Sequence, residues 1–211
     1  CVIARSNEAK ALGIKMGEPA FKIKTLILKN KVNVFSTNFA LYGDLSHRVM
    51  ETLKTEFNIL EIYSIDEAFV DFSILTSMDR AIFIRNKIRQ CTGIPVSIGI
   101  APTKTLAKIA NHIAKKYTQK GVCILNNEIE INKILNSYPI EDIWGIGRRY
   151  AHKLKQSGIK TALEFKNADT TWIRHNLSID GIHIQMELKG KQYYNLKTYP
   201  SIKKSISTTR S

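Results

Sequence analysis

The hydrophobic periodicity changes near residue 121, and this change constrains the fold more than any other feature of the sequence. Before it, apolar runs of strand length alternate with amphipathic helical segments; from about Asn127 onward the pattern is helical only and is broken by Pro139 and several glycines. Gly, Asn and Lys accumulate at residues 121–127, so we expect a domain boundary there. The sequence therefore predicts an α+β domain with helices packed on one side of a sheet, followed by an all-α domain.

The first part of the chain predicts an ordered series of short elements. The expected helices cover residues 7–12, 38–57, 78–91 and a segment that begins after a Thr103 cap, and the expected strands cover residues 32–36, 59–65, 68–72 and 96–100. Only Asp66 and Glu67 separate the second and third strands, which suggests a tight antiparallel hairpin. If one more strand preceded the first long helix, this order would be a ferredoxin-like layout.

Composition narrows the range of functions. The chain has 32 Lys+Arg against 18 Asp+Glu, and this excess of positive charge favours a polyanionic partner such as nucleic acid. No apolar run approaches the ~20 residues of a membrane helix, and Cys1, Cys91 and Cys123 have neither metal-like spacing nor an even count. We expect a soluble, cytoplasmic protein. The chain opens on an apolar run without an initiator Met, so we expect it to be a piece of a longer protein.

The adjacent carboxylates Asp66 and Glu67 are the first candidate site. Neighbouring side chains on a strand point to opposite faces, so the pair cannot chelate one ion alone. A third carboxylate on a neighbouring strand could complete a metal site of the kind used in phosphoryl transfer. A solvated turn is the alternative interpretation, but the apolar flanks of the expected hairpin favour a metal site.

The helix after Thr103 carries the second candidate site. Opposite its apolar face, Lys104, Lys108, His112 and Lys115 fall at spacings of four, four and three and form one stripe. Such a stripe is often only a solvated face. Residues 101–160, however, hold eleven Lys+Arg against four Asp+Glu, which fits a site that binds phosphates beside a metal ion.

A glycine-rich turn followed by a basic helix is the third candidate site. Glycines at this spacing allow backbone N–H groups to approach a phosphate at a helix N-terminus, as in a helix-hairpin-helix that grips the DNA backbone. The expected DNA contacts are Gly145, Ile146, Gly147, Arg148, Arg149 and Lys153, together with Lys104 and Lys108. A Rossmann fingerprint does not fit, because no strand precedes the turn and the third glycine is absent. A plain turn between two helices remains the alternative.

Taken in order, these segments resemble the Y-family translesion DNA polymerases, and most of all their UmuC branch. The motifs that carry the resemblance lie at residues 1–17, 63–69, 99–111 and 142–149. The resemblance implies partial fingers at residues 1–36, a palm at 37–122 that lacks its first strand, a helix-hairpin-helix thumb at 123–197, and a linker at 198–211 into a little finger that is missing from the chain.

The resemblance also implies roles for individual residues. Asp66 would be a metal ligand and Glu67 the adjacent carboxylate, in an enzyme that uses two Mg²⁺ ions. Lys10, where the family commonly has Arg, and Lys115 would contact the incoming triphosphate. The remaining expected contacts near the nucleotide are Tyr42 and, in the floor under the nascent base pair, Ile3. Two departures are that Asn7 replaces a common aromatic, and that the family's first aspartate ligand and its steric gate lie before this chain begins.

The implied function is template-directed, error-prone DNA synthesis during DNA repair and the SOS response. The implied partners are primer-template DNA, a deoxynucleoside triphosphate, a UmuD-like dimer, a recombinase filament and a sliding clamp. We expect this 211-residue piece to polymerise poorly by itself. Two other readings remain open: a non-enzymatic helix-hairpin-helix module that binds DNA, and a scaffold for protein partners whose charge is incidental.

Overall fold

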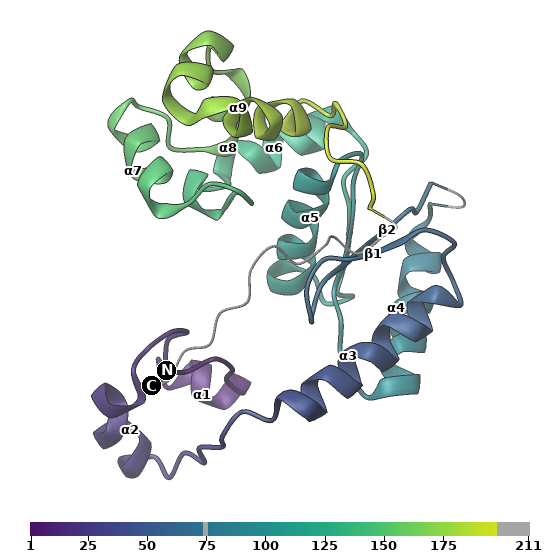
Figure 1. Ribbon diagram of the computed structural model, residues 1–211, viewed down its shortest axis with the longest axis vertical. Coiled ribbons are helices and arrows are strands. Elements are labelled where there is room, and N and C mark those ends of the chain that lie inside the picture. Colours follow the sequence, from purple (N-terminus) through teal and green to yellow (C-terminus); the bar gives the residue numbers. More distant parts are fainter. Residues whose placement is uncertain (74–75, 198–211) are drawn as a thin grey trace. The chain divides into compact units, whose positions relative to one another are not determined.

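A computed structural model describes residues 1–73 and 76–197 of the chain (Figure 1). Contacts between residues divide the chain into two units, Cys1–Ala40 and Leu41–Ser211. The predicted linker at residues 198–211 lies outside the described residues.

The first unit is a small helical segment with little core. It contains α1 (Asn7–Ala11), a 3₁₀ turn (Ala20–Ile23) and α2 (Lys24–Lys29). Ser6 caps α1, and Gly13 follows it with φ +82°, so the helix predicted at residues 7–12 is confirmed. The strand predicted at residues 32–36 is wrong. Val34 and Phe35 there are 65% and 85% exposed, and no described strand pairs with them, so alternation alone did not produce a strand.

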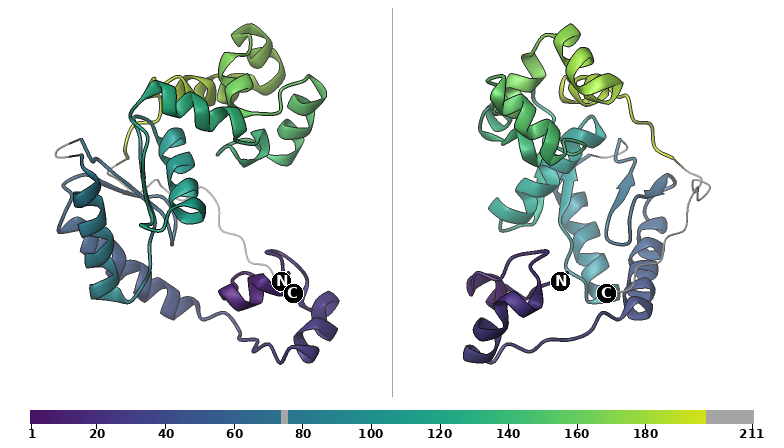
Figure 2. Two further views of the ribbon diagram at one scale, coloured as in Figure 1. Left: turned by 180° about the vertical axis from the view of Figure 1, so that it is seen from behind. Right: turned by 60° about the vertical axis from the view of Figure 1, so that its left-hand side comes forward.

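The second unit begins with two helices that flank a hairpin. They are α3 (Phe39–Lys54) and α4 (Met78–Thr92), which confirm the helices predicted at residues 38–57 and 78–91. Glu56, just after α3, pairs with Arg80 at 2.7 Å and with Lys87 at 2.6 Å, both on α4. These ion pairs join the end of α3 to α4, and the two helices lie side by side in both views of Figure 2.

The hairpin between these helices differs from the expected one. Strand β1 (Leu60–Ile62) pairs antiparallel with β2 (Ala68–Val70), and Ile62 opposite Ala68 is the last pair. Five residues, Tyr63 to Glu67, therefore make the connection, and the expected two-residue turn at Asp66-Glu67 is wrong. The apolar alternation misled the prediction, because Ile62 and Ile65 are 54% and 52% exposed and do not mark a buried face.

A βαβ unit follows, made of β3 (Ile98–Ile100), α5 (Lys104–Tyr117) and β4 (Val122–Ile124). Strands β3 and β4 pair in parallel, and α5 packs against both. Thr103 caps α5 as predicted, but β4 was not expected. Gly99 permits the close packing: a Cβ there would lie 2.1 Å from the backbone nitrogen of Asn111 on α5.

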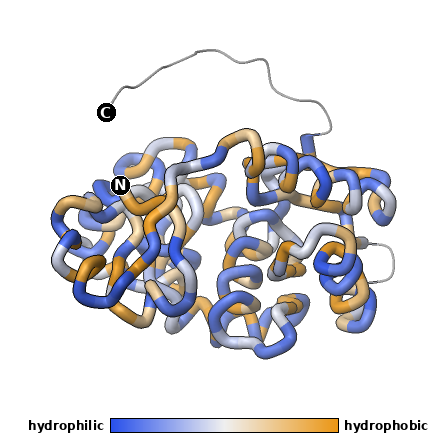
Figure 3. The backbone as a smooth tube through the Cα atoms, turned by 90° about the horizontal axis from the view of Figure 1, so that it is seen from below, coloured by the Kyte–Doolittle hydropathy of each residue, from blue (hydrophilic) through white to orange (hydrophobic). Residues whose placement is uncertain are grey.

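The rest of the described chain is helical, as predicted. It contains α6 (Glu128–Ser137), a 3₁₀ turn (Ile140–Asp142), α7 (Arg148–Gln156), α8 (Ala162–Asn167) and α9 (Thr170–Leu188), which group together beyond α5 in Figure 1. Apolar and polar residues alternate around the helical turns (Figure 3), and the apolar face of α5 joins the apolar faces of these helices in one core. Among the described residues, no helix is long and apolar enough to cross a lipid bilayer.

Glu187 near the end of α9 is a fully buried carboxylate that joins three segments. One oxygen accepts the backbone N–H of Thr105, in the first turn of α5, at 3.0 Å. The other accepts the N–H groups of Tyr193 and Tyr194 at 2.7 and 3.0 Å. Glu187 thus satisfies one of the N–H groups that a helix leaves open at its start and also holds the segment after α9 against the core.

We expect Glu187→Ala to lower the free energy of unfolding by about 3 kcal/mol, because it leaves buried N–H groups without an acceptor. Urea unfolding followed by circular dichroism measures this loss. The control is Glu130→Ala, which removes an exposed carboxylate on α6. Equal stability of the two variants would contradict the role given to Glu187.

Candidate active site

The residues Tyr63–Glu67, which we call the acidic bend, turn the chain between β1 and β2. The N–H groups of Tyr63 and Ser64 both donate to the carbonyl oxygen of Glu67 at 3.0 Å, which closes the bend. The hydroxyl of Ser64 donates to the Asp66 carboxylate at 2.7 Å. Asp66 is exposed, so its remaining oxygen lone pairs are open to an ion or a substrate.

The acidic bend lies against the basic stripe of α5. The ammonium of Lys108 forms an ion pair and hydrogen bond with the Glu67 carboxylate. It also lies over the ring of Tyr63, 5.6 Å from the ring centroid. The Lys108 side chain is 24% exposed and that of Glu67 42%. The structure therefore brings the first and second candidate sites together on one surface.

Lys104, one turn before Lys108, is placed differently. Its ammonium donates to Glu61 at 2.5 Å and to the carbonyl of Asn195 at 2.9 Å, and it lies 5.0 Å over the ring of Phe69. Only 8% of the Lys104 side chain is exposed. This lysine joins α5 to β1 and to the segment after α9, so its ammonium is not available to DNA in this arrangement. Glu61 was not predicted as part of this surface, because a charged residue on a short strand carries no signal of burial.

The other predicted nucleotide contacts are spread over both units. Lys115 is exposed in the last turn of α5, and Tyr42 lies in the first turn of α3. Lys10 on α1 donates to the side chain of Asn7 at 3.2 Å, and Ile3 is 52% exposed. Lys10 and Ile3 belong to the first unit, so their contact with a nucleotide beside Asp66 stays a prediction.

His112, on the same stripe, is partly buried. Its Nδ1 lies 2.8 Å from the hydroxyl of Tyr138, which donates to the carbonyl of Asp142 at 3.2 Å. Burial lowers the pKa of His112, and the charges of Lys116 and Lys115 lower it further, whereas Asp142 opposes them. Burial likewise raises the pKa of the Tyr138 hydroxyl, so both groups stay neutral near pH 7.

The glycine-rich turn has a backbone conformation that requires glycine at one position. Gly145 has φ +92°, and a Cβ there would lie 2.8 Å from Cδ1 of Ile184, so only glycine fits. Gly147 is the N-cap of α7 and makes no side-chain cap hydrogen bond, which leaves backbone N–H groups at the helix start for another acceptor. The element before the turn is a 3₁₀ turn rather than an α-helix.

The side chains of α7 divide between the core and the surface. Ala151 and Leu154 are buried, while Arg148 and Arg149 are exposed. The ammonium of Lys153 donates to the carbonyl of Asn176 on α9 at 3.2 Å. The exposed arginines and the open helix start form one basic end that can bind phosphates.

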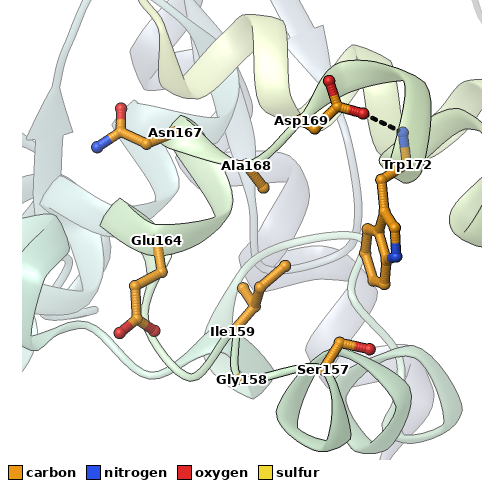
Figure 4. Close-up of a pocket in the computed structure, with 8 residues that line it drawn as sticks. All are labelled: Ser157, Gly158, Ile159, Glu164, Asn167, Ala168, Asp169 and Trp172. Atoms are coloured by element: carbon orange, nitrogen blue, oxygen red, sulfur yellow. Dashed lines mark hydrogen bonds between the residues drawn. The ribbon is translucent and has the colours of Figure 1, made fainter.

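A surface hollow of about 590 Å³ lies elsewhere, between the end of α7 and the helices α8 and α9 (Figure 4). Its carboxylates already cap helices: Glu164 accepts the N–H of Thr161 at 2.9 Å, and Asp169 accepts the N–H of Trp172 at 2.7 Å. Both carboxylates of the hollow thus stabilise the starts of neighbouring helices.

Within residues 1–73 and 76–197, no cluster of three His, Cys, Asp or Glu side chains could hold a metal ion. The third carboxylate expected beside Asp66 and Glu67 is thus not supplied by the described residues.

Comparisons with known proteins show the family of the chain. A sequence model of the impB/mucB/samB family, described as IMS, matches residues 1–112, which is more than half of the chain. The chain belongs to this family. It is 43% identical over 219 residues to Protein UmuC and 41% identical over 218 residues to Protein ImpB, both of Salmonella typhimurium. Each of these matches covers 100% of this chain and 51% of the relative, so the chain spans about half the length of these curated relatives.

More distant relatives and solved structures agree with the family. The chain is 34% identical over 206 residues to DNA polymerase IV of Picrophilus torridus, a match that covers 97% of this chain and 58% of that protein. A DinB family error-prone DNA polymerase from Sulfolobus solfataricus superposes with a TM-score of 0.73 at 25% identity, over 93% of this chain and 60% of that one. An insertion ternary complex of Dbh DNA polymerase superposes with a TM-score of 0.75 at 25% identity, over 91% of this chain and 56% of that one. The predicted family and the predicted α+β fold class are confirmed.

The depressed pKa of His112 predicts a specific pH dependence of stability. In the unfolded chain this histidine gains a proton near pH 6.5, but in the folded chain it does so only at lower pH, so acidification below pH 6.5 favours unfolding. We expect the free energy of unfolding to fall less steeply between pH 7 and pH 5 in His112→Gln than in the wild-type chain. Urea unfolding at several pH values measures the slope, with the exposed His152→Gln as the control. Identical slopes in His112→Gln and wild type would contradict this assignment.

Proposed function

We propose that the protein to which this chain belongs is a template-directed DNA polymerase of the translesion type. The observation that carries the proposal is the ion pair between Glu67 and Lys108, because it sets the acidic bend beside the basic stripe of α5. Carboxylates for a divalent ion and ammonium groups for phosphates are the two requirements of nucleotidyl transfer. Membership of the impB/mucB/samB family supports the same reaction.

The donors of the acidic bend fit Mg²⁺. This ion is usually held by one or two carboxylates, with water and substrate phosphates in the remaining positions, and Asp66 is exposed with Glu67 beside it. When bound, Mg²⁺ would neutralise part of the negative charge of the triphosphate and would lower the pKa of the primer hydroxyl. We propose Asp66 and Glu67 as its ligands, in a site for two ions that another carboxylate completes.

Residues around the bend would bind and orient the triphosphate. Lys108 faces the bend and can exchange its carboxylate partner for a phosphate oxygen, because charge-assisted hydrogen bonds form readily with either. Lys10 and Lys115 would hold the phosphates, and Tyr42 and Ile3 would border the sugar and the base. Lys104, already paired with Glu61, would act by holding α5 to the hairpin rather than by touching DNA.

The basic end of α7 would grip the DNA backbone. The first N–H groups of α7, after Gly147, lie at a helix start where the dipole favours an anion, and Arg148 and Arg149 are exposed beside it. Gly145 and Ile146 would shape the turn, since the N–H of Ile146 already donates to the carbonyl of Ile143 at 3.0 Å. Such contacts go to phosphates and do not read the base sequence, which suits a polymerase that moves along its template.

The wider assignments follow from the same proposal. We assign residues 1–36 to partial fingers, 37–122 to the palm and 123–197 to the thumb. The protein would act in the cytoplasm on primer-template DNA and deoxynucleoside triphosphates, with a UmuD-like dimer, a recombinase filament and a sliding clamp as partners. The 211-residue chain by itself would extend primers poorly, because its described residues supply only part of a two-ion site.

A non-enzymatic DNA-binding module is the second candidate function. The basic end of α7 would favour it if the carboxylates of the acidic bend were only structural. The two candidates differ in whether Asp66 is needed for catalysis, and the next experiment separates them.

We expect Asp66→Ala in the full-length protein to reduce primer extension by roughly 10³-fold or more, because loss of a metal ligand removes several kcal/mol of transition-state stabilisation. Affinity for primer-template DNA should change little. The control is Asp79→Ala, which removes an exposed carboxylate in the first turn of α4. Extension by Asp66→Ala at the wild-type rate would rule out the assigned ligand, and DNA binding without extension by the wild-type protein would favour the second candidate.

We expect Arg148→Gln and Arg149→Gln each to weaken binding of duplex DNA to a similar degree for all sequences. Each loss of a phosphate contact should make the slope of log K against log salt shallower by about 1. Fluorescence anisotropy at several salt concentrations measures the slope. Lys133→Gln, on the exposed side of α6, removes the same charge elsewhere and should leave the slope unchanged. If the three variants had the same salt slope, the DNA would bind to another surface.

A further inference from the structure

An aromatic contact connects the acidic bend to the glycine-rich turn. Trp144 directly precedes Gly145, and its indole Nε1 donates to the hydroxyl of Tyr63 at 3.0 Å. The two rings meet edge to face, with centroids 5.4 Å apart and an interplanar angle of 85°. Tyr63 in turn begins the acidic bend, and its N–H donates to the carbonyl of Glu67. One hydrogen bond therefore links the turn that is proposed to hold DNA directly to the bend that is proposed to hold the reacting groups.

Neighbouring rings fix the orientation of this pair. Phe69 on β2 lies 5.6 Å from Tyr63 and 5.8 Å from Trp144, and Tyr194 lies 5.6 Å from Trp144. The ammonium of Lys108, which pairs with Glu67, lies over the Tyr63 ring. The aromatic rings thus come from three separate parts of the second unit: the hairpin, the glycine-rich turn and the segment after α9. Each aromatic pair favours one relative geometry.

We propose that Trp144 and Tyr63 are positioning residues that set the DNA-gripping turn relative to Asp66 and Glu67. This inference rests on the proposed function. A rigid link is needed there, because a displacement of about 1 Å between a bound substrate and the reacting groups can cost a hundredfold in rate. Neither side chain touches the nucleotide or the metal in this proposal; both act through the backbone segments that they hold.

The contact between Trp144 and Tyr63 is partly exposed, so its effect on the reaction can be measured apart from its effect on stability. Tyr63 is 45% exposed, whereas Ile143 and Ile146 on either side of the turn are 2% and 6% exposed and anchor it in the core. Removing the polar atom of the contact therefore leaves the core intact. The variants should fold, and their effect should fall on the rate rather than on the melting temperature.

The test uses the full-length protein and three substitutions that each keep a ring. Tyr63→Phe and Trp144→Phe both remove the same hydrogen bond, and Trp172→Phe changes the other tryptophan, on α9, as the control. Steady-state primer extension gives kcat and KM for the nucleotide, and anisotropy gives the affinity for primer-template DNA.

We expect Tyr63→Phe and Trp144→Phe each to lower kcat about tenfold, with KM, DNA affinity and melting temperature close to wild type. The double variant should be no slower than either single variant, because both changes break one interaction. Trp172→Phe should match wild type. Unchanged kcat in the single variants, or losses that multiply in the double variant, would overturn the proposal.

A spectroscopic measurement gives a second readout. The part of the tryptophan emission of the full-length protein that Trp144→Phe removes should change when primer-template DNA binds, and Tyr63→Phe should remove at least half of that change. An equal emission change with and without Tyr63 would count against the link. A wild-type protein that neither extends primers nor binds DNA would refute the proposed function, whereas normal wild-type extension with unaffected variants would refute the positioning role alone.

Discussion

The ion pairs between α5 and the β1–β2 hairpin hold together the surface on which the proposed chemistry depends. Lys104 pairs with Glu61 and Lys108 pairs with Glu67, one helical turn apart, so two contacts fix the helix along the hairpin. The first pair is buried and the second partly open. Loss of one partner of a buried pair leaves an uncompensated charge and costs about 3–5 kcal/mol. Because separation of Lys104 from Glu61 would leave such charges, this pair holds α5 firmly against the hairpin. The Lys108–Glu67 pair is exposed enough to exchange partners.

The same helix connects this surface to the core. The opposite face of α5 places Leu106, Ile109 and Ala110 among the side chains of α6–α9. Glu187 of α9 accepts the N–H of Thr105 and thereby ties the start of α5 to the end of the last helix. One helix thus carries the basic stripe on one side and the packing of the helical region on the other. A change in the position of α5 would move both proposed binding surfaces together.

The sequence predicted most helices, because each depends on local spacing, whereas the roles of the three candidate sites stay predictions. It predicted the strands less well. The hairpin was placed with too short a turn because Ile62 and Ile65 continue the apolar alternation while remaining exposed. Strand β4 was missed for two reasons. Its three residues, Val122–Ile124, are all apolar and show no alternation, and helix α5 separates it in the sequence from its partner β3. Parallel pairing of that kind is decided by tertiary contacts and leaves no local pattern.

The lysines of α5 show most clearly that residue spacing in the sequence does not reveal which charged side chains are buried. Lys104 and Lys108 have the same residue type, the same helix face and a separation of one turn, so the sequence treats them as equivalent. Their environments differ because the segment after α9 covers Lys104 with the carbonyl of Asn195, while nothing comparable in the described chain covers Lys108. A contact between residues 91 positions apart therefore decides that one ammonium is structural and the other remains open to a phosphate. Charge patterning locates a binding face, but long-range packing selects the residues on it that are free to bind.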